Sequence, residues 1–475
     1  MPAQVPSVWQ TNGGVYVGYA ANSTEGPPAL GDVLRYTGDR HIALVGNSGS
    51  GKSRRWLVPN LAQLTGWSML VIDPKGDLLR MCGGWRAAHG GENVIFDPFD
   101  VTKMNSRGCN LLQALDPASD DFPDDAMGQA EGIIEVGNTH EPHWPQSFQD
   151  FLAAVAMYIR LIMPETGTYG DVRALMAQTD EDLRAMINGG SFEYNGNSYP
   201  DMIRAGLYHD WEEIGHKAAR FSAIDPQNRE LHSILSTGLT QCRFLDSRAI
   251  KRELAGPAFD FTVMKEKPVT VWLVLPARRL ITHAKWLRLI LTTAIQSLMN
   301  DTNKAKVPVA LVCDEAAALG HLPILENTVA LMRGYGLKLI TIWQDLAQLQ
   351  GIYSKRWESF IGNAGVLQSF AAQDVTTSEY LSKLTGQTTR QAMSIGMSQG
   401  LQAGAAPSLT SSANLGPIPM PLMLPQDIRN MDDGYTVTFA HRLNGKRSKG
   451  TVRAYLPYPT EIPGLQAICK LDPSA

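Results

Sequence analysis

The chain has 475 residues, of which 44% are hydrophobic and 19% charged, the composition of an ordinary globular protein. The formal net charge of −4 excludes a uniformly basic nucleic-acid-binding protein, although a ring can keep a basic lining inside an acidic exterior. No apolar run reaches the roughly 18 residues that span a bilayer, and the N-terminus lacks a signal peptide's basic and apolar regions. The five cysteines are scattered without a Cys-x-x-Cys pair, which argues against a zinc site or a disulfide framework.

The first part of the chain predicts a nucleotide-binding α/β domain. Alternating residues around 15–19 predict edge strands that lead into residues 42–45, an apolar run typical of a short buried strand. A helix is expected at about 52–64, followed by strands at 67–73 and 93–96 with a helix between them. Strands and helices that alternate at this spacing predict a parallel sheet with crossover helices.

A complete phosphate loop follows the first buried strand. Its pattern is G-x-x-x-x-G-K-[ST], and its residues are Gly46, Asn47, Ser48, Gly49, Ser50, Gly51, Lys52 and Ser53. The glycines let backbone N–H groups point inward around phosphate oxygens, and the next helix directs its N-terminal dipole at the same anion. Lys52 can reach the β- and γ-phosphates, and the Ser53 hydroxyl can ligate Mg²⁺. The sequence therefore predicts that the chain binds ATP with Mg²⁺.

The pattern changes between residues 118 and 257, where strand signals almost vanish. Residues 145–163 place six apolar side chains on one helical face, and further helical stretches follow, with a loop at 189–200. The prediction is an all-α domain (118–257) inserted into a RecA-like domain formed by residues 1–117 and 258–475. His140 and His143 lie close together here, but Pro142 separates them and no third ligand is evident, so a metal site is not favoured.

After residue 257 the α/β pattern resumes. Strands are expected at 269–275, 307–315, 337–343 and 366–370, and helices at 283–300, 322–334, 345–352 and 374–384. Residues 391–416 are rich in Gly, Ser, Ala and Gln and predict a flexible loop. Two last strands, at 436–440 and 451–455, return to the sheet.

A second group of polar residues can complete the nucleotide site. Asp314 and Glu315 end an apolar strand, where Asp314 can assist Mg²⁺ and Glu315 can activate the attacking water. Gln344 ends the next strand and can contact the γ-phosphate, although a strand-end amide can equally bind backbone. Arg333 and Arg40 each have a plain alternative, as a cation at a helix C-terminus and as a solvated residue at a strand edge.

These stretches resemble the type IV secretion coupling proteins, the TraG/TraD-type conjugation ATPases. The likeness covers most of residues 35–457. The segments that carry it are residues 71–77, 314–323, 331–336, 344–349 with Tyr353, 363–365, 378–382 and 421–425.

The resemblance implies a homo-hexameric ring that uses ATP to deliver conjugative DNA or effector protein to a type IV secretion system. It implies that Gln344 is the γ-phosphate sensor, that Arg333 lies at a subunit boundary and that Arg40 is an arginine finger acting in trans. It further implies that the helical insert receives the substrate, at the cytoplasmic face of the bacterial inner membrane.

One feature departs from the family pattern. Family members typically begin with transmembrane helices and this chain shows none, so either partners hold it at the membrane, or an anchor lies on another chain or was removed. Two alternatives to the coupling function stay open: an FtsK/HerA-like DNA-translocating ATPase unrelated to secretion, and a nucleotide-binding substrate receptor with negligible turnover.

Overall fold

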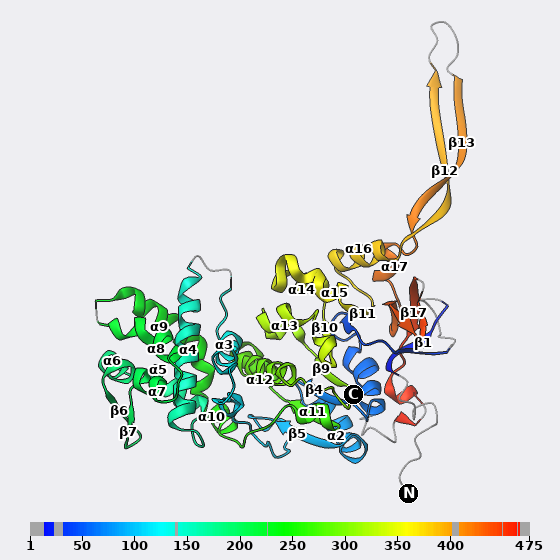
Figure 1. Ribbon diagram of the computed structural model, residues 1–475. Helices are drawn as coiled ribbons and strands as arrows, with labels where there is room; N and C mark the ends of the chain where they lie inside the picture. The colour runs from blue at the N-terminus through cyan, green and yellow to red at the C-terminus, as the bar shows by residue number, and fades with distance from the viewer. Residues whose placement is uncertain are drawn as a thin grey trace.

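A computed structural model describes residues 14–22, 32–137, 141–225, 227–400, 408–448, 450–462 and 464–465. It shows an α/β body that carries a large sheet, a helical module beside it, and a β-ribbon that projects from the body (Figure 1). The predicted fold class, α/β with a mainly parallel sheet and a helical insertion, is confirmed. His140 lies outside the described residues.

Eleven strands of the described chain form one sheet. Seven of them run parallel, in the spatial order β11 (Ala364–Ser369), β3 (His41–Val45), β10 (Leu337–Trp343), β9 (Val309–Cys313), β4 (Ser68–Ile72), β8 (Val269–Leu273) and β5 (Glu92–Phe96). An antiparallel extension beyond β11 consists of β14 (Tyr435–Ala440), β17 (Thr451–Tyr455), β1 (Val15–Ala20) and β2 (Val33–Tyr36). The predicted edge strands and the return of the C-terminal strands are therefore both confirmed.

Helices cover the parallel sheet on both faces. Strand β4 shows this directly, because Met69 and Val71 belong to one apolar core while Leu70 and Ile72 belong to the other. A parallel strand that is buried on both faces is expected to be apolar throughout, as β4 is. The helices of this domain are α1 (Val58–Gln63), α2 (Asp77–His89), α11 (Val263–Glu266), α12 (Leu280–Asn300), α13 (Pro323–Thr328), α14 (Leu346–Tyr353), α15 (Trp357–Gly362), α16 (Val375–Leu384) and α17 (Pro425–Arg429).

The module between β5 and β8 is helical, as predicted, with one exception. Its helices are α3 (Phe122–Ile133), α4 (His143–Ile162), α5 (Tyr169–Met176), α6 (Asp180–Asn188), α7 (Met202–Tyr208), α8 (Glu213–Ala218), α9 (Arg229–Gln241) and α10 (Arg248–Leu254). The exception is a hairpin of β6 (Ser191–Tyr194) and β7 (Asn197–Pro200), where the sequence predicts a loop. The prediction was wrong because Asn195 and Gly196 both adopt positive φ, which closes a tight turn between short strands.

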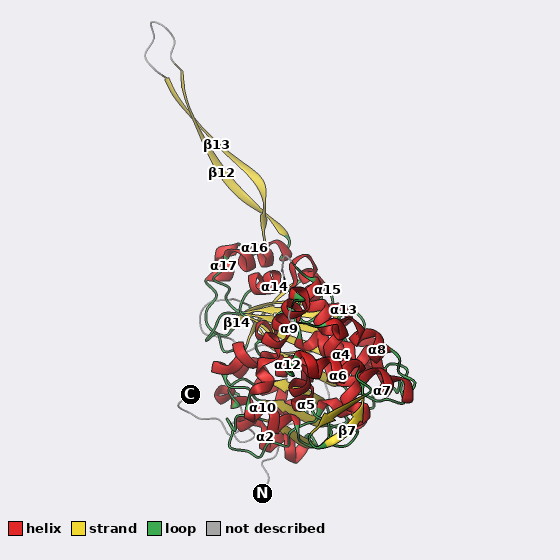
Figure 2. Cartoon of the chain, turned by 90° about the vertical axis from the view of Figure 1, so that its left-hand side faces the viewer, coloured by secondary structure: helices red, strands yellow, loops and turns green. Residues whose placement is uncertain are grey.

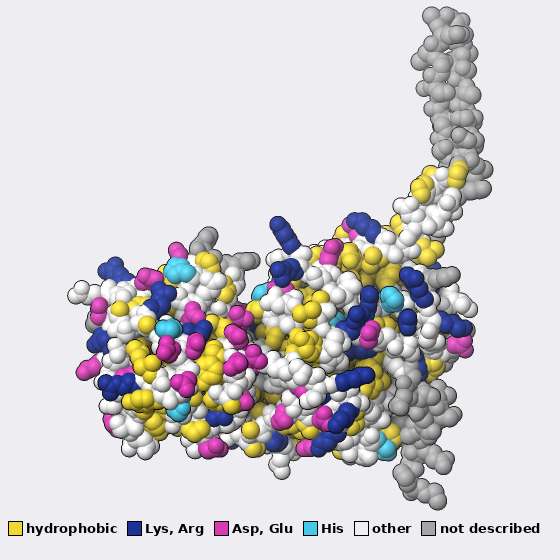
Figure 3. Space-filling model, viewed as in Figure 1, with side chains coloured by type: hydrophobic (Ala, Val, Ile, Leu, Met, Phe, Trp, Pro, Cys, Tyr) yellow, Lys and Arg dark blue, Asp and Glu magenta, His cyan; other side chains and the backbone are white. Residues whose placement is uncertain are grey.

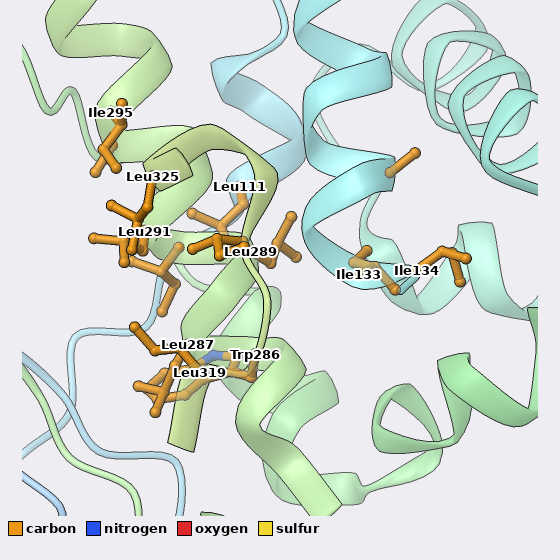
Figure 4. Close-up of a cluster of buried hydrophobic side chains, with 14 of the residues drawn as sticks. Leu111, Ile133, Ile134, Trp286, Leu287, Leu289, Leu291, Ile295, Leu319 and Leu325 are labelled. Carbon is orange, nitrogen blue, oxygen red and sulfur yellow. The ribbon is translucent and has the colours of Figure 1, made fainter. Parts of the chain in front are cut away.

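Helix α12 joins the module to the sheet domain. Helix α3 packs against α12 on one side and against α4 on the other. The labelled side chains in Figure 4 show this junction, where Ile133 and Ile134 lie at the end of α3, and Leu319 lies beside Trp286 and Leu287 of α12. One continuous apolar core therefore extends from the sheet into the module.

The predicted flexible loop at 391–416 is wrong for the residues that the structure describes. Strands β12 (Gln387–Gly400) and β13 (Ser408–Pro421) form a long antiparallel ribbon that projects from the body near α16 and α17 (Figures 1 and 2). Every residue of β12 is paired with a residue of β13. The composition gave a wrong prediction because two strands can pair their backbone N–H and C=O groups with each other even when their residues have a low intrinsic strand propensity.

The packing of α9 on α4 gives a test of the module's core. A Cβ built on Gly238 would lie 1.9 Å from Cγ of Phe148. We expect Gly238→Ala to lower the free energy of unfolding by about 1–3 kcal/mol, because the Phe148 ring would have to move. The matched control is Gly351→Ala in α14, where a Cβ meets nothing within 4 Å and alanine should stabilise by about 0.5–1 kcal/mol. Urea denaturation of both variants measures the difference, and equal stabilities would contradict this packing.

In the described part of the chain, every helix is too short or too polar to cross a membrane.

Candidate nucleotide site

The phosphate loop begins at the carboxyl end of β3, near the middle of the sheet. Strand β3 lies between β11 and β10, and all five of its residues are buried. The Gly46 N–H donates to the Trp343 carbonyl over 3.0 Å, which ties the start of the loop to β10. Gly49 and Gly51 both have φ of 83°, a left-handed conformation that L side chains rarely adopt. These two positions explain why the loop requires glycine.

Helix formation resumes directly after the loop. Residues Lys52–Leu57 form a single wide turn (η2) that continues into α1, so the predicted helix at about 52–64 is present with an altered first turn. Its apolar side, with Trp56, Leu57 and Leu61, is buried under the sheet. This packing fixes the position of Lys52 and Ser53 relative to the strand ends.

Two of the predicted site residues meet across 261 positions of the sequence. The Ser53 hydroxyl lies 3.0 Å from Oδ1 and 2.8 Å from Oδ2 of Asp314. Asp314 follows β9, and only β10 lies between β9 and β3 in the sheet. A hydroxyl and a carboxylate at this separation are the oxygen ligands that Mg²⁺ takes in phosphate-loop proteins, so the pair fits that cation.

The loop is closed on itself in this structure. The Lys52 ammonium donates to the carbonyl oxygens of Gly46 and Asn47, the second over 2.8 Å. Burial lowers the pKa of Lys52, and the carboxylates of Asp314 and Glu315 oppose that shift. The hydroxyl of Ser50 is buried and has no hydrogen-bond partner in the described structure. An unpaired hydroxyl beside an ammonium held only by carbonyls suits a site built for an anion.

Asp314 has a second carboxyl group near it that the sequence prediction missed. Asp73 follows β4, the strand beside β9, and it accepts a hydrogen bond from the Leu79 N–H over 2.9 Å. Burial raises the pKa of Asp314 to about 7, with Asp73 adding to the shift and the Ser53 hydrogen bond opposing it. Burial likewise raises the pKa of Asp73 to about 6. The signal in the sequence was an apolar strand that ends in a carboxylate, the same signal that identified Asp314.

Glu315 and Gln344 are also brought together. The Gln344 side-chain amide donates to Oε1 of Glu315 over 3.2 Å. The backbone of Glu315 has φ of 153° and ψ of 63°, which is rare for a residue with a side chain and costs about 1–3 kcal/mol. Such a conformation persists only where the surrounding structure determines it, and it is frequent at functional sites.

Arg40 and Arg333 lie elsewhere. Arg40 comes just before β3, so the length of a five-residue strand, roughly 17 Å, separates it from its own phosphate loop. Arg333 precedes β10, and its Nε lies 3.7 Å from Oδ2 of Asp39. The two arginines line a cavity of about 460 Å³ together with His441 and Arg442, and an adjoining cavity of about 280 Å³.

Two of the residues that line the cavity with Arg40 were not predicted. His441 and Arg442 follow β14, about 400 positions from Arg40 in the sequence. They reach it only because β14 pairs with β11, which is the neighbour of β3. The order of strands in a sheet cannot be predicted from one sequence, so no local signal could have identified His441 and Arg442. Figure 3 shows Lys and Arg side chains on both the helical module and the sheet domain, some of them on the side that carries the antiparallel strands.

The fold and this site together define a phosphate-loop α/β protein with an inserted helical module. The family described as "Type IV secretory system Conjugative DNA transfer" matches residues 6–450, and the chain belongs to that family. The resemblance noted in the sequence is thereby confirmed.

Relatives with a recorded function have low sequence identity to this chain, but they match most of its length. The conjugal transfer protein TraG of Escherichia coli is 25% identical over 399 residues, which cover 80% of this chain and 59% of TraG. The protein VirD4 of Agrobacterium fabrum is 24% identical over 420 residues, which cover 86% of this chain and 58% of VirD4. This chain therefore spans less than two thirds of the length of these relatives.

Solved structures show the same fold. The conjugative coupling protein TrwBdeltaN70 in complex with sulphate has a TM-score of 0.63 at 18% identity, covering 95% of this chain and 97% of that one. TrwB in complex with ADP and Mg²⁺ has a TM-score of 0.60 at 18% identity, covering 90% and 87%. TrwB has also been solved with a non-hydrolysable ATP analogue, with a TM-score of 0.61 at 16% identity.

Proposed function

We propose that this chain is the ATP-hydrolysing motor of a coupling protein, which recruits a conjugative DNA–protein complex or an effector protein to a type IV secretion system and powers its transfer. The contact between Ser53 and Asp314 carries this proposal, because it joins the phosphate loop to the strand that bears the catalytic carboxylate. TrwB, which shares this fold, has been solved with ADP and Mg²⁺ and with an ATP analogue, and this supports nucleotide binding by the present chain.

Each residue of the site has a role that follows from its position. Lys52 is placed to exchange the carbonyls of its own loop for the β- and γ-phosphates, and Ser53 and Asp314 would hold Mg²⁺. When bound there, the cation would neutralise charge on the phosphates. Glu315 accepts the proton of the attacking water, and Gln344 connects that carboxylate to the γ-phosphate.

Hydrolysis requires a second copy of the chain in this scheme. Because Arg40 and Arg333 lie at the opposite end of the strands from their own phosphate loop, they can serve only a neighbour's nucleotide. An arginine supplied in trans stabilises the charge of the transferring phosphoryl group. We therefore propose a homo-hexameric ring, held at the cytoplasmic face of the inner membrane through other secretion components.

The proposal is tested by measuring phosphate release from Mg–ATP with and without single-stranded DNA, together with capture of the relaxase–DNA complex of the element that encodes the chain. Release that increases with substrate, and capture of the relaxase, are expected. Binding of duplex DNA alone would favour an FtsK/HerA-like translocase. Capture of the relaxase without phosphate release would favour a receptor with negligible turnover.

The pKa of Asp314 gives this site a pH dependence. Below about pH 7 the carboxyl group is protonated, so a cation must displace its proton to bind. We expect the affinity for Mg–ADP to fall by up to about tenfold per pH unit below pH 7 and to be constant above it. Calorimetric titration between pH 6 and 8.5 measures the affinity, with ADP in a chelator as the control.

Asp314→Asn should bind Mg–ADP weakly and without that pH dependence. An equal affinity of the unaltered chain at pH 6 and pH 8 would contradict the assignment of Asp314 to the cation.

A further inference from the structure

The Arg288 side chain connects the helical module to the loop that follows the catalytic carboxylates. It is fully buried in α12. Its Nε donates to the Gly132 carbonyl at the end of α3, over 2.7 Å. Its Nη1 donates to the carbonyls of Leu319 and His321, each over 2.7 Å. One guanidinium therefore holds the end of α3 and the loop at 316–322 together.

Glu135 extends this connection toward the module. Its Oε1 lies 2.5 Å from Nη1 of Arg288, in an ion pair whose arginine is buried and whose glutamate is 40% exposed. Glu135 also exchanges two backbone hydrogen bonds with the side chain of Gln241, the last residue of α9, over 2.7 and 2.9 Å. The Lys285 ammonium joins the group by donating to Gln241 Oε1 and to the Ile133 carbonyl. A continuous polar path thus runs from α9 through Glu135 to Arg288.

The loop that Arg288 holds has an unusual backbone conformation. Gly320 lies between the two bound carbonyls and has φ of 62°, and a Cβ there would lie 3.1 Å from Glu135 Oε1. Five residues before it, Glu315 has the rare backbone conformation described above. Because that conformation depends on its surroundings, the anchoring of the following loop helps to set where the Glu315 carboxylate lies.

Stability alone is a poor reason for this arrangement. A buried guanidinium pays a large desolvation cost, and burial lowers the pKa of Arg288. Well-packed apolar residues commonly replace such buried ion pairs without loss of stability. A buried polar network that links two structural units is better explained by what it connects.

We propose that Arg288 is a positioning residue through which the helical module controls Glu315. A shift of α9 or of the end of α3, as when the module takes up substrate, moves Glu135 and Arg288 and with them the loop at 316–322. The effect on turnover rests on the proposed function, in which Glu315 activates water. The mechanical connection between the module and the loop at 316–322 does not depend on that proposed function.

A double-mutant cycle between Gln241 and Arg288 tests this inference. Gln241→Ala removes the module's end of the path, including an acceptor of Lys285, and leaves the hydrogen bonds of Arg288 in place. We nevertheless expect it to lower kcat by roughly 2- to 30-fold with an unchanged KM for ATP. Arg288→Lys should have a similar effect, and the two changes together should cost no more than one alone. Glu135→Asp, which keeps the charge, should retain more activity than Glu135→Ala. Gln227→Ala, an exposed glutamine of the module outside the path, is the matched control.

Hydrogen exchange of the amides in residues 315–322 provides a second readout that needs no turnover. We expect faster exchange in Gln241→Ala and Arg288→Lys than in Gln227→Ala, at equal Tm. Unchanged exchange in that segment, or independent multiplicative effects on kcat, would overturn the inference. If the unaltered chain released no phosphate, the proposed function would fail, while the exchange data would still decide whether the connection exists.

Discussion

Glu315→Gln should abolish most ATP turnover while leaving nucleotide binding intact. The amide keeps the size of the side chain and its hydrogen bond with Gln344, but it cannot accept a proton from water. General bases commonly contribute about 10²- to 10⁴-fold, so we expect kcat to fall by that factor. Phosphate release measures turnover, and a fluorescent ATP analogue measures binding.

The control for this variant is Glu358→Gln, which removes an exposed carboxylate at the start of α15, away from the site. It should behave as the unaltered chain. Turnover by Glu315→Gln at the unaltered rate would assign the base to another group, for which Asp73 at the end of the adjacent strand β4 is a candidate.

Arg40→Ala should reduce turnover by about 10³- to 10⁵-fold, the range found for arginine fingers. Arg40 lies at the amino end of β3, so the effect must act on a neighbouring subunit. Arg248→Ala is the control, because Arg248 is an exposed arginine in the module.

Mixing of subunits separates an action in trans from a local defect. Lys52→Ala subunits should be inactive because they bind no nucleotide, but they still carry Arg40. In a ring with head-to-tail interfaces, equal mixing with Arg40→Ala subunits should restore about a quarter of the interfaces and a corresponding share of the activity. A mixture as inactive as its components would contradict the placement of Arg40 in a neighbour's site.

Much of the candidate nucleotide site could be predicted because its signals are local. The phosphate loop is a contiguous motif, and Asp314, Glu315 and Gln344 each end an apolar strand. Parallel strands bring their carboxyl ends to one edge of a sheet, so residues at those ends meet even when 261 positions separate them. The same reasoning would have added Asp73.

The parts that could not be predicted depend on contacts between distant segments. The residues around Arg40 come together only through the order of strands, and the path through Arg288 depends on carbonyl groups at the end of α3 and in the loop at 316–322. The predicted helix at 322–334 is divided into α13 and a turn at Met332–Tyr335 (η8), although its apolar spacing suited one helix. Tertiary packing overrides local propensity in such cases.

The ribbon of β12 and β13 illustrates a different limit. Its residues have the composition of a flexible linker. They form regular strands only because β12 pairs with β13. The boundaries of the helical domain, at residues 118 and 257, stay a prediction. Helix α3 packs equally on α12 of the sheet domain and on α4 of the module, so it belongs to both.

The most direct test of the central claim is turnover per subunit measured against protein concentration, with the oligomeric state determined in the same samples. If the phosphate loop is one half of a motor site that a neighbour's Arg40 completes, turnover per subunit should rise steeply where rings form and rise further with single-stranded DNA. Turnover per subunit that stays constant from monomer to assembled ring would contradict the account.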